Sequence, residues 1–515
     1  MKTSDERVVV LDFGSQYAQL IARRIRELGV YCEILPHNTS KSAILSGGTK
    51  GIILSGGPSS VLEESHPGVD HGIFDAGLPV LGICYGMQLM AEILGGSIDV
   101  GKAREYGPAT ITVDNASELL SDVGNDMDVW MSHGDHVTVL PEGFEVLSHT
   151  SSIPMAAMGD LSKRLFGLQF HPEVIHTPKG MKILRNFLFL SCKCLGGWTM
   201  AGFVDKEIER IRTEVGDSKV ICGLSGGVDS SVTAALLDRA IGSQMTAIFV
   251  DNGLLRAGEV DEIKRLFTHD HPINMTIVDA GDIFLERLKG VVDPEEKRKI
   301  IGKTFIDVFD KEALRIGGAE FLAQGTLYPD VIESRSAKGG PSSTIKSHHN
   351  VGGLPEDLGF KLIEPLKELF KDEVRRLGKE LSLPERVIER QPFPGPGLAI
   401  RILGEVNKEN VAILQQADKR VREEIESYEG SKDIWQYFGV LLPVKTVGVM
   451  GDERTYSNVV AVRAVSSVDG MTADWAKIPY GVLESISTRI INEVEGVNRV
   501  VYDISSKPPG TIEWE

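Results

Sequence analysis

Long apolar runs are missing from this sequence of 515 residues. No stretch approaches the roughly 18 consecutive apolar residues that a membrane-spanning helix needs. The charged segment Met1–Arg7 leads directly into apolar residues at Val8–Leu11, so we expect no signal peptide. Hydrophobic residues make up 42% and charged residues 25%, which is typical of a soluble globular protein and excludes wholesale disorder.

Positive charge is in deficit. The 55 Lys and Arg residues face 73 Asp and Glu residues, which gives a formal net charge of −18. Because nucleic-acid binding usually needs a basic surface, this balance argues against nucleic acid as a main partner, although it leaves room for a local basic patch.

Cysteine is scarce, with five residues at Cys32, Cys84, Cys192, Cys194 and Cys222. An odd number of scattered cysteines in a large chain favours free thiols in a reducing compartment, so we predict a cytoplasmic location. Cys192 and Cys194 have the spacing of half a metal site, but no second Cys or His pair at ligand spacing follows them. We therefore interpret this pair as structural.

Glycine, by contrast, is abundant. Its 55 occurrences exceed the usual share of about 7%, and no collagen-like period accompanies them. The excess therefore indicates tight turns and loops that cradle phosphate groups. At roughly 100–200 residues per domain, the length predicts about three domains.

Two successive alternations of apolar runs and amphipathic stretches predict βαβ units with parallel sheets. In the first, we predict a helix at 15–28 and strands at 8–12, 51–54 and 80–83. In the second, which follows a break near 191–203, we predict a helix at 203–215 and strands at 219–222, 247–250 and 275–278. This second alternation ends at Gln391–Gly397, a segment that contains too much proline for a helix or a central strand.

The remaining residues favour a smaller α+β unit, with strands at 447–450, 459–465 and 500–504 and a helix at 480–494. We therefore predict an α/β protein with two doubly wound parallel-sheet domains, at 1–195 and 196–390, and a small C-terminal α+β domain at 391–515. The 391–397 segment is either a linker or a turn that carries the chain into the last domain.

The motif Gly82-Ile-Cys84-Tyr-Gly86 follows an apolar strand and precedes a helical stretch at 87–94. Glycines two residues either side of a nucleophile allow the sharp turn of a nucleophile elbow, which leaves the next N–H, that of Tyr85, free for an oxyanion. The start of a helix also favours a thiolate. A buried structural cysteine beside two packing glycines explains this motif equally well.

A His–Glu pair further along the chain favours the catalytic interpretation of Cys84 over the structural one. His171 and Glu173 stand two residues apart, so an extended backbone would direct both side chains to one face. Glu173 would then orient His171, and His171 would deprotonate Cys84. The Gly-rich turn Leu54–Ser59 would supply a second oxyanion donor near Gly56 or Gly57.

These motifs together resemble the class I glutamine amidotransferase family over about residues 6–195. The resemblance rests on Ser55-Gly-Gly-Pro58, Gly82–Gln88 and Phe170–Glu173, in that order. It implies that glutamine is hydrolysed through a Cys84 thioester with release of ammonia. It also implies glutamine-binding residues at Gln88, Ser132 and His133, although His133 and His136 are equally well interpreted as loop residues.

A second motif, Ser225-Gly-Gly-Val-Asp229-Ser-Ser231, lies between an apolar strand and a helical stretch. Backbone N–H groups in such a turn form an anion site at the helix N-terminus, and Asp229 could hold Mg²⁺ beside bound phosphates. The motif is neither Walker A nor Gly-x-Gly-x-x-Gly. Gly302-Lys-Thr304 is no P-loop either, because Lys297 stands where that pattern requires glycine.

This second motif resembles the signature of the ATP pyrophosphatase (PP-loop) superfamily, whose domain has an adenine-nucleotide α-hydrolase-like fold. The resemblance implies cleavage of ATP to AMP and pyrophosphate, with the substrate adenylated. It assigns ATP contacts to Ser225, Gly226, Gly227, Val228, Asp229, Ser230 and Ser231, and to Asp251 at the end of the next strand. Asp251-Asn-Gly253 is also a common turn sequence.

Further segments resemble the bacterial GMP synthetase family across all three predicted domains, namely 293–302, 325–330, 346–350, 391–399 and 507–515. The resemblance implies that ATP·Mg²⁺ adenylates XMP, that ammonia then displaces AMP to give GMP, and that the last domain forms a homodimer. It assigns XMP contacts to Lys507 and Glu513, and ATP contacts to Lys346 and Lys371. Most lysines, however, lie on solvated faces, so Lys346 and Lys371 also have a strong interpretation as ordinary surface residues.

Two other functions compete with this one. A PP-loop enzyme that modifies a tRNA base is disfavoured by the acidic composition and by the lack of a recognisable RNA-binding module. A regulatory protein with an inactive glutaminase is disfavoured because Cys84, His171 and Glu173 are all present.

Overall fold

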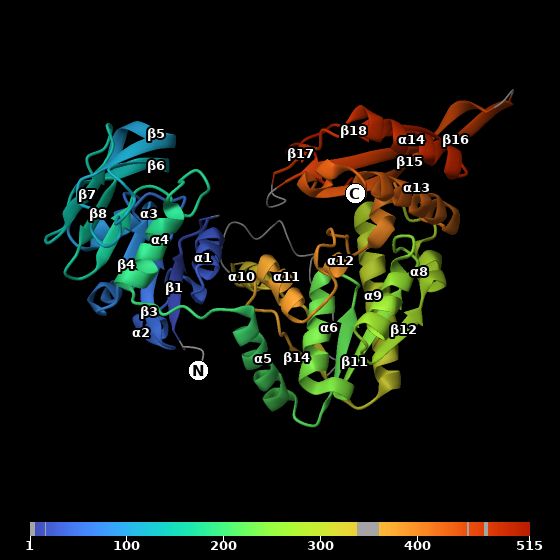
Figure 1. Ribbon diagram of the computed structural model, residues 1–515, viewed down its shortest axis with the longest axis horizontal. Helices are drawn as coiled ribbons and strands as arrows, with labels where there is room; N and C mark the ends of the chain where they lie inside the picture. The colour runs from blue at the N-terminus through green and yellow to red at the C-terminus, as the bar shows by residue number, and fades with distance from the viewer. Residues whose placement is uncertain (1–5, 16, 337–359, 451–452, 468–471) are drawn as a thin grey trace. The chain divides into compact units, whose positions relative to one another are not determined.

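The computed structural model describes residues 6–15, 17–336, 360–450, 453–467 and 472–515 (Figure 1). The chain divides into two compact units, Met1–Phe203 and Val204–Glu515. All five cysteines are free thiols, as predicted. Within the described residues, every helix is too short or too polar to cross a bilayer.

The first unit is built on one sheet of nine strands. Its strands are β1 (Arg7–Asp12), β2 (Cys32–Pro36), β3 (Thr49–Leu54), β4 (Val80–Ile83), β5 (Ser97–Val113), β6 (Asp126–Val139), β7 (Glu145–His149), β8 (Ala157–Asp160) and β9 (Leu165–Leu168). Its helices are α1 (Ala18–Glu27), α2 (Lys41–Leu45), α3 (Tyr85–Ile93) and α4 (Gly180–Asn186), with single turns η1 (His71–Asp75) and η2 (Phe187–Ser191).

The order of this sheet is β2-β1-β3-β4-β9-β8-β7-β5-β6. The first five strands are parallel and bury continuous apolar runs such as Val8–Leu11, as a sheet covered on both faces requires. Helix α1 packs on β1 and β2, and helix α3 packs on β3, β4 and β9. The predicted α/β class is therefore confirmed for this unit.

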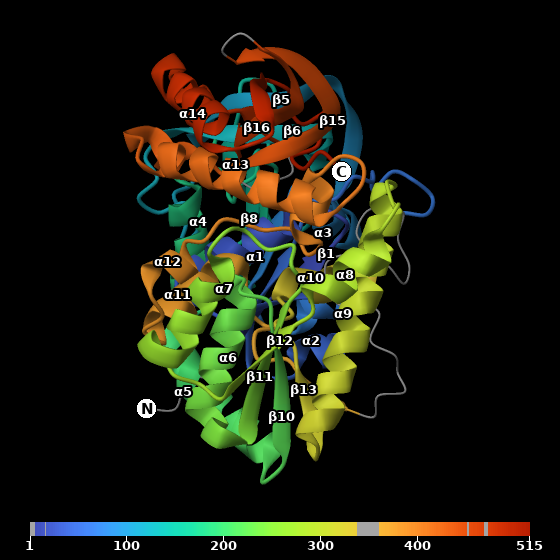
Figure 2. The same cartoon turned by 90° about the vertical axis from the view of Figure 1, so that its right-hand side faces the viewer.

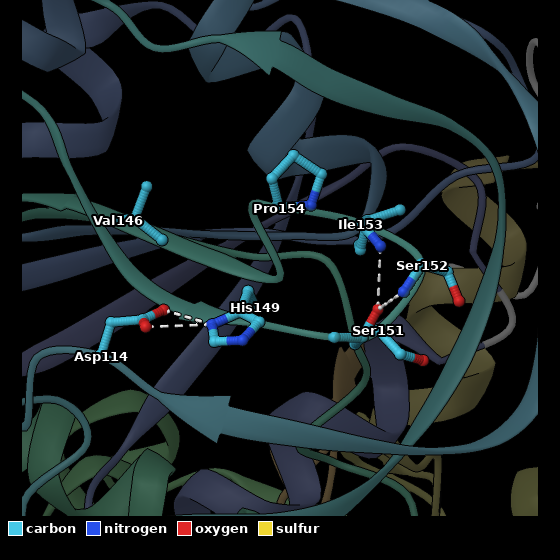
Figure 3. A pocket seen from close by; sticks show the side chains of 8 residues that line it. Asp114, Val146, His149, Ser151, Ser152, Ile153 and Pro154 are labelled. Carbon is cyan, nitrogen blue, oxygen red and sulfur yellow. Dashed lines mark hydrogen bonds and ion pairs between the residues drawn. The ribbon is translucent and has the colours of Figure 1, made fainter.

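The sequence does not predict the other four strands, which are antiparallel. Strand β6 alternates buried and exposed residues, as a strand with one wet face does. A pocket of about 640 Å³ lies beside β7 (Figure 3) and is lined by Asp114, Val146, His149, Thr150, Ser151, Ser152, Ile153 and Pro154. None of the predicted site residues that the structure describes lines this pocket.

The second unit contains a parallel sheet and a smaller mixed sheet. Its strands are β10 (Lys219–Leu224), β11 (Met245–Asp251), β12 (Met275–Asp279), β13 (Ala319–Ala323), β14 (Lys361–Ile363), β15 (Gln436–Met450), β16 (Glu453–Ser466), β17 (Asp474–Trp475) and β18 (Val497–Asp503). Its helices are α5 (Met200–Val215, which begins in the first unit), α6 (Val228–Ile241), α7 (Glu259–Arg265), α8 (Gly281–Leu288), α9 (Pro294–Ile316), α10 (Tyr328–Ser336), α11 (Lys371–Glu380), α12 (Glu385–Ile388), α13 (Lys408–Glu426) and α14 (Tyr480–Glu493). Single turns are η3 (Gly242–Gln244), η4 (Leu266–Asp270), η6 (Gly397–Arg401) and η7 (Glu429–Asp433).

The parallel sheet has the order β12-β11-β10-β13-β14, flanked by α6 and α9 (Figure 2). Helix α9 begins where the Asp293 carboxylate accepts a hydrogen bond from the Glu296 N–H at 2.8 Å, with Pro294 in the first turn. The strand order reverses direction between β10 and β13, and open α/β sheets bind ligands beyond the strand ends at such a point. The loop after β10 contains the Ser225–Ser231 motif.

The smaller sheet pairs β15 with β16 and β16 with β17 in antiparallel fashion, and β16 with β18 in parallel. Helix α13 packs on β15, and α14 packs on β18 and α13. The predicted α+β character of the C-terminal region is therefore confirmed.

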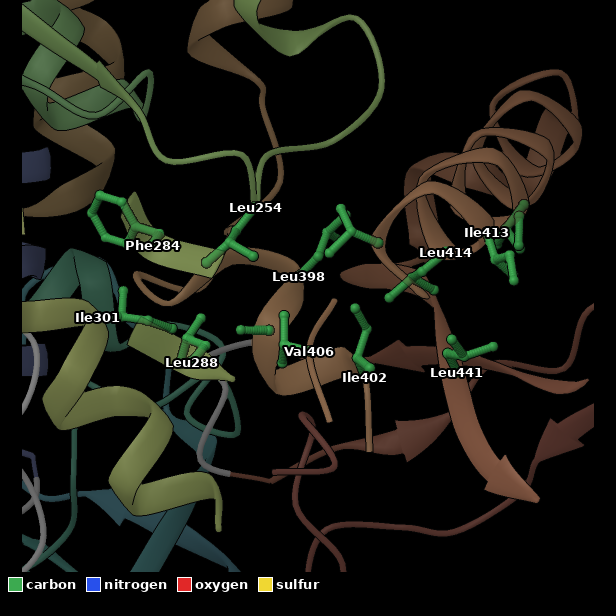
Figure 4. Close-up of a cluster of buried hydrophobic side chains, with 14 of the residues drawn as sticks. Leu254, Phe284, Leu288, Ile301, Leu398, Ile402, Val406, Ile413, Leu414 and Leu441 are labelled. Carbon is green, nitrogen blue, oxygen red and sulfur yellow. The ribbon is translucent and has the colours of Figure 1, made fainter. Parts of the chain in front are cut away.

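One hydrophobic core joins the parallel sheet to the C-terminal region. Leu254, Phe284, Leu288 and Ile301 lie in the same buried cluster as Leu398, Ile402, Val406, Ile413, Leu414 and Leu441 (Figure 4). The 391–397 segment is a packed turn, because the guanidinium groups of Arg256 and Arg401 lie 4.6 and 5.3 Å from the centre of the Phe393 ring. The domain boundaries near 195 and 390 stay predictions.

Candidate active site

Cys84 lies at a sharp turn between β4 and α3. Its φ of +52° and ψ of −107° are a strained combination for a residue with a side chain. The neighbouring glycines make the turn possible, since a Cβ on Gly82 would lie 2.5 Å from the Gly86 oxygen and a Cβ on Gly86 would lie 2.4 Å from the Leu54 oxygen. The turn therefore has the geometry of a nucleophile elbow.

His171 and Glu173 lie next to Cys84. His171 Nδ1 is 2.7 Å from Glu173 Oε1, and the imidazole also hydrogen-bonds the Cys84 side chain. The sequence predicts an extended backbone here, which is wrong: β9 ends at Leu168, and the pair lies in the turn that follows. The Thr177 hydroxyl fixes this turn by donating to the His171 carbonyl at 2.7 Å.

The electrostatic surroundings of His171 favour its protonated form. Burial alone would lower its pKa, but the charge of Glu173 and the hydrogen bonds to Cys84 and Glu173 outweigh burial and raise the pKa to about 10. His171 is therefore a strong proton acceptor next to the Cys84 sulfur.

Two backbone N–H groups are candidates for an oxyanion hole. Tyr85 is the first residue of α3, and the first N–H groups of a helix have no partner within it. Gly56 lies beside the same side chains, because a Cβ there would be 3.2 Å from His171 Cε1 and 3.8 Å from Cys84 Cβ. The Ser55 hydroxyl holds this loop by donating to the Gly56 carbonyl at 2.8 Å.

Of the three predicted glutamine-binding residues, Ser132 contacts Cys84 directly and Gln88 connects to it through Gln169, whereas His133 bonds neighbouring groups. The Ser132 carbonyl accepts the Cys84 S–H at 3.5 Å. His133 is buried in β6, with Nε2 3.2 Å from Glu105 Oε2 and Nδ1 3.1 Å from the Asp135 carbonyl. Its pKa is lowered by burial, against the attraction of Glu105. Since His133 and His136 both lie in β6, their interpretation as loop residues is wrong.

The Ser225–Ser231 loop joins β10 to α6 and is held by its own hydroxyls. Ser225 Oγ and Ser230 Oγ are 3.0 Å apart, and the Gly227 N–H donates to Ser225 Oγ. Gly226 has a φ of +75°, and α6 begins at Val228. The Ser231 hydroxyl is buried without a hydrogen-bond partner within the described chain. The loop thus presents backbone N–H groups and hydroxyls at a helix N-terminus.

Asp229 and Lys371 form an ion pair at this loop. Lys371 Nζ lies 2.6 Å from Asp229 Oδ1, although the residues are 142 positions apart. Asp251 ends β11, where it accepts the Gly253 N–H at 3.0 Å and lines a pocket of about 390 Å³ with Arg256 and Gln415. It therefore caps a turn and also faces a pocket. Lys346 lies outside the described residues.

The fit of a metal at the loop depends on Asp229 alone. In the part of the chain that the structure describes, no group of three or more His, Cys, Asp or Glu side chains could hold a metal ion. Mg²⁺ carried by a nucleotide usually takes only one or two carboxylates together with phosphate oxygens and waters. A single aspartate at the start of α6 fits that requirement.

Three family models match the chain. The class-I glutamine amidotransferase model matches residues 9–190, the NAD synthase model matches 201–289, and the GMP synthase C-terminal domain model matches 423–514.

Curated relatives match over the full length. The glutamine-hydrolysing GMP synthase of Bacillus cytotoxicus is 56% identical over 515 residues, which is 100% of both chains. That of Geobacillus kaustophilus is 57% identical over 512 residues, which is 99% of this chain and 100% of the relative.

The chain belongs to the glutamine-hydrolysing GMP synthase family. This membership confirms the predicted class of enzyme, a glutamine-dependent GMP synthase. A solved glutamine amidotransferase from Thermotoga maritima is 18% identical, with a TM-score of 0.31, over 37% of this chain and 99% of that one.

Both residues predicted to contact a purine nucleotide lie in the C-terminal tail of this family member. The Glu513 carboxylate accepts two hydrogen bonds from Arg401, at 3.0 and 2.7 Å, and one from Gln436 at 2.9 Å. The backbone of Lys507 pairs with Ala473.

Several residues at these sites are missed by sequence reasoning. Gln169 Nε2 lies 3.8 Å from Cys84 Sγ, and buried Lys297 binds Glu515 Oε2 at 2.6 Å. Arg401 is fully buried. A signal exists for two of them: Gln169 directly precedes the Phe170–Glu173 motif, and Arg401 interrupts an apolar run at 398–403.

Replacing Glu173 with Gln should reverse the pKa shift of His171. In the folded chain the imidazole should titrate near pH 10, above its ordinary 6.5. Its protonation therefore stabilises the fold fully below pH 6.5, and this stabilisation is lost as the pH rises toward 10. In Glu173→Gln, burial remains and the titration midpoint should fall below 6.5.

Imidazole ¹⁵N chemical shifts followed against pH measure this directly. The matched control is Glu142→Gln, at an exposed position, which should leave the His171 titration unchanged. A His171 midpoint that is the same in both variants would contradict the assigned role of Glu173.

Proposed function

We propose that this chain converts XMP to GMP, using ATP and glutamine and releasing AMP, pyrophosphate and glutamate. The observation that carries the proposal is the strained Cys84, hydrogen-bonded to His171, which is in turn bound to Glu173. The Ser225–Ser231 loop with its Asp229–Lys371 pair supports the ATP-dependent half.

The first unit hydrolyses glutamine. Cys84 loses its proton to His171, and the sulfur attacks the side-chain amide carbon of glutamine. The N–H groups of Tyr85 and Gly56 stabilise the resulting oxyanion, and His171 returns the proton to the leaving ammonia. Water then attacks the thioester and releases glutamate. Ser132 and His133 contact the bound glutamine.

The second unit activates XMP. The N–H groups and hydroxyls of Ser225–Ser231 bind the phosphates of ATP, and Asp251 contacts the nucleoside. Asp229 would hold Mg²⁺, which would supply neutralising charge beside the phosphates, and Lys371 contacts the same phosphates from its position beside Asp229. The C2 oxygen of XMP attacks the α-phosphorus, pyrophosphate leaves, and ammonia then displaces AMP at C2. Lys346 joins these ATP contacts.

The C-terminal tail binds XMP. Lys507 contacts its phosphate and Glu513 its purine. The two hydrogen bonds from Arg401 and the one from Gln436 fix the Glu513 carboxylate, so this acceptor is held in place before XMP arrives. Anionic ATP and XMP thus meet local cations in a chain of net charge −18.

A direct assay tests the overall reaction. The protein is incubated with ATP, Mg²⁺, glutamine and XMP, and GMP, AMP and pyrophosphate are quantified. Equal amounts of the three products support the proposal, whereas ATP cleavage without GMP contradicts it.

Replacing Cys84 with Ala should separate the two sites. Glutamine-dependent GMP synthesis should fall by at least about 1,000-fold because the nucleophile is gone. Synthesis from ammonium salts should continue, since the second unit needs only ammonia. Both rates are measured as GMP formed.

Cys32→Ala is the matched control, because Cys32 is a buried cysteine of the same unit. It should retain both activities. Joint loss of the two activities in Cys84→Ala would contradict the two-site mechanism.

Replacing Asp229 with Asn should slow synthesis from glutamine and from ammonium salts to the same extent. Adenylation itself needs the metal at Asp229, so pyrophosphate release should fall on the order of 100-fold. Asp238→Asn, on the same helix α6, should behave like the unaltered chain. Pyrophosphate release at the normal rate in Asp229→Asn would exclude the metal role of this residue.

We further infer a cytoplasmic homodimer. Val447 and Val449 of β15 and Tyr456 of β16 are exposed apolar side chains, and Val447 pairs with Tyr456 in the ladder. Such an apolar patch on one face of a hairpin suits a contact with a second copy of the chain.

The Val449→Glu variant should dissociate this dimer, because the contact would bury an unpaired charge. Sedimentation equilibrium should give about twice the 56.2 kDa chain mass for the unaltered protein and the monomer mass for the variant. Leu161→Glu, another exposed apolar position, should stay dimeric. An unaltered protein that sediments as a monomer would disprove the dimer.

A further inference from the structure

A buried run of hydrogen bonds joins the Cys84 sulfur to a backbone carbonyl through two glutamine side chains. Gln169 Nε2 lies 3.8 Å from Cys84 Sγ, and Gln88 Nε2 lies 3.3 Å from Gln169 Oε1. Gln88 Nε2 also lies 2.7 Å from the Asp135 carbonyl oxygen. Gln169 is 0% and Gln88 4% exposed, so solvent does not compete for these amides.

The chemistry of the carbonyl fixes the direction of every bond in this run. A carbonyl oxygen only accepts, so the Gln88 atom that faces Asp135 must be the NH₂ group. That NH₂ group also faces Gln169, so the Gln169 atom nearest to it must be oxygen. The NH₂ group of Gln169 is then the end that faces the sulfur, and Gln169 is a donor to Cys84.

We propose that Gln169 is a further catalytic residue, which donates a hydrogen bond to the Cys84 sulfur, and that Gln88 is the positioning residue that keeps this donor aimed at it. The proposal rests on the proposed nucleophilic role of Cys84.

Such a donor acts whenever the sulfur carries negative charge. In the neutral thiol form, the Cys84 S–H donates to the Ser132 carbonyl at 3.5 Å. When its proton moves to His171, the electron pair stays on the sulfur, and the Gln169 N–H stabilises that charge. The same N–H stabilises the sulfur again when water attacks the thioester and the C–S bond breaks. Burial strengthens both interactions because the local dielectric constant is low.

This arrangement also restricts what Gln88 can do for glutamine. An amide NH₂ group has two hydrogens, and the Asp135 carbonyl and Gln169 Oε1 take both. Gln88 therefore has no donor left for the substrate, and only its oxygen can contact glutamine. Its main role becomes the orientation of Gln169.

The Gln169→Met variant tests the donor. Alkylation of Cys84 by iodoacetamide is followed against pH in the full chain, with the Cys84 peptide quantified by mass. Loss of a hydrogen bond to a charged sulfur should move the pH midpoint upward by about one unit. Gln244→Met, a glutamine bonded to the Gly216 and Ser218 carbonyls, is the matched control and should leave the midpoint unchanged.

The Gln88→Met variant tests the positioning role and does not depend on the folding of Gln169→Met. It should raise the same midpoint by a smaller amount and lower kcat for glutamine hydrolysis more than it changes KM for glutamine. The double variant should have the same pH midpoint as Gln169→Met, because Gln88 affects the Cys84 sulfur only through Gln169. An unchanged midpoint in Gln88→Met, additive effects in the double variant, or a rise in KM alone would overturn the proposal.

Alkylation of Cys84 distinguishes the role of the cysteine from the role of the two glutamines. If iodoacetamide does not modify Cys84 in the unaltered chain, the nucleophile assignment under the proposed function is wrong. If it modifies Cys84 with the same pH midpoint in the unaltered chain and in Gln88→Met, only the role of the two glutamines is wrong.

Discussion

The close contact of three backbone segments in the first unit governs the geometry of its active site. Gly82 lies against Gly86, and Gly86 lies against the carbonyl of Leu54, at distances that leave no room for a Cβ. The chain must therefore turn from β4 into α3 within one residue, which forces Cys84 to a positive φ at a cost of about 1–3 kcal/mol. The same contact brings the loop after β3, with Gly56, to the Cys84 side chain. One steric requirement thus sets the nucleophile and both candidate oxyanion donors.

In the second unit, close backbone packing also positions the candidate site, which lies where the strand order of the parallel sheet reverses. The loops after β10 and β13 meet there, and Gly325 packs against the backbone of Asp229 and the Thr233 hydroxyl. This unit also buries charged groups. Lys297 forms an ion pair with Glu515, and Arg401 forms one with Glu513. Removing one partner of such a pair would leave an uncompensated charge, so these pairs define the position of the tail strictly.

The features that the sequence predicts are those carried by contiguous residues. Gly82–Gly86, His171–Glu173 and Ser225–Ser231 are short motifs, and the parallel strands are apolar runs. Features that join distant residues lie beyond such patterns. Arg401 meets Glu513 across 112 positions, and Gln88 meets Gln169 across 81, because strand register and helix packing bring them together. Strand β6 of the first unit escapes prediction because polar residues on its wet face interrupt the apolar signal.

The parallel sheet and the C-terminal sheet share one hydrophobic core, and this affects how the second unit unfolds. Leu398 donates its N–H to the Leu254 carbonyl at 2.8 Å, and Leu414 and Leu441 lie in the same cluster as Phe284. Detaching the C-terminal sheet would expose the apolar surface of the nucleotide-binding sheet as well, so the two sheets unfold as one cooperative block. The loop that holds Asp251 therefore takes its rigidity from side chains more than 140 positions further along the chain.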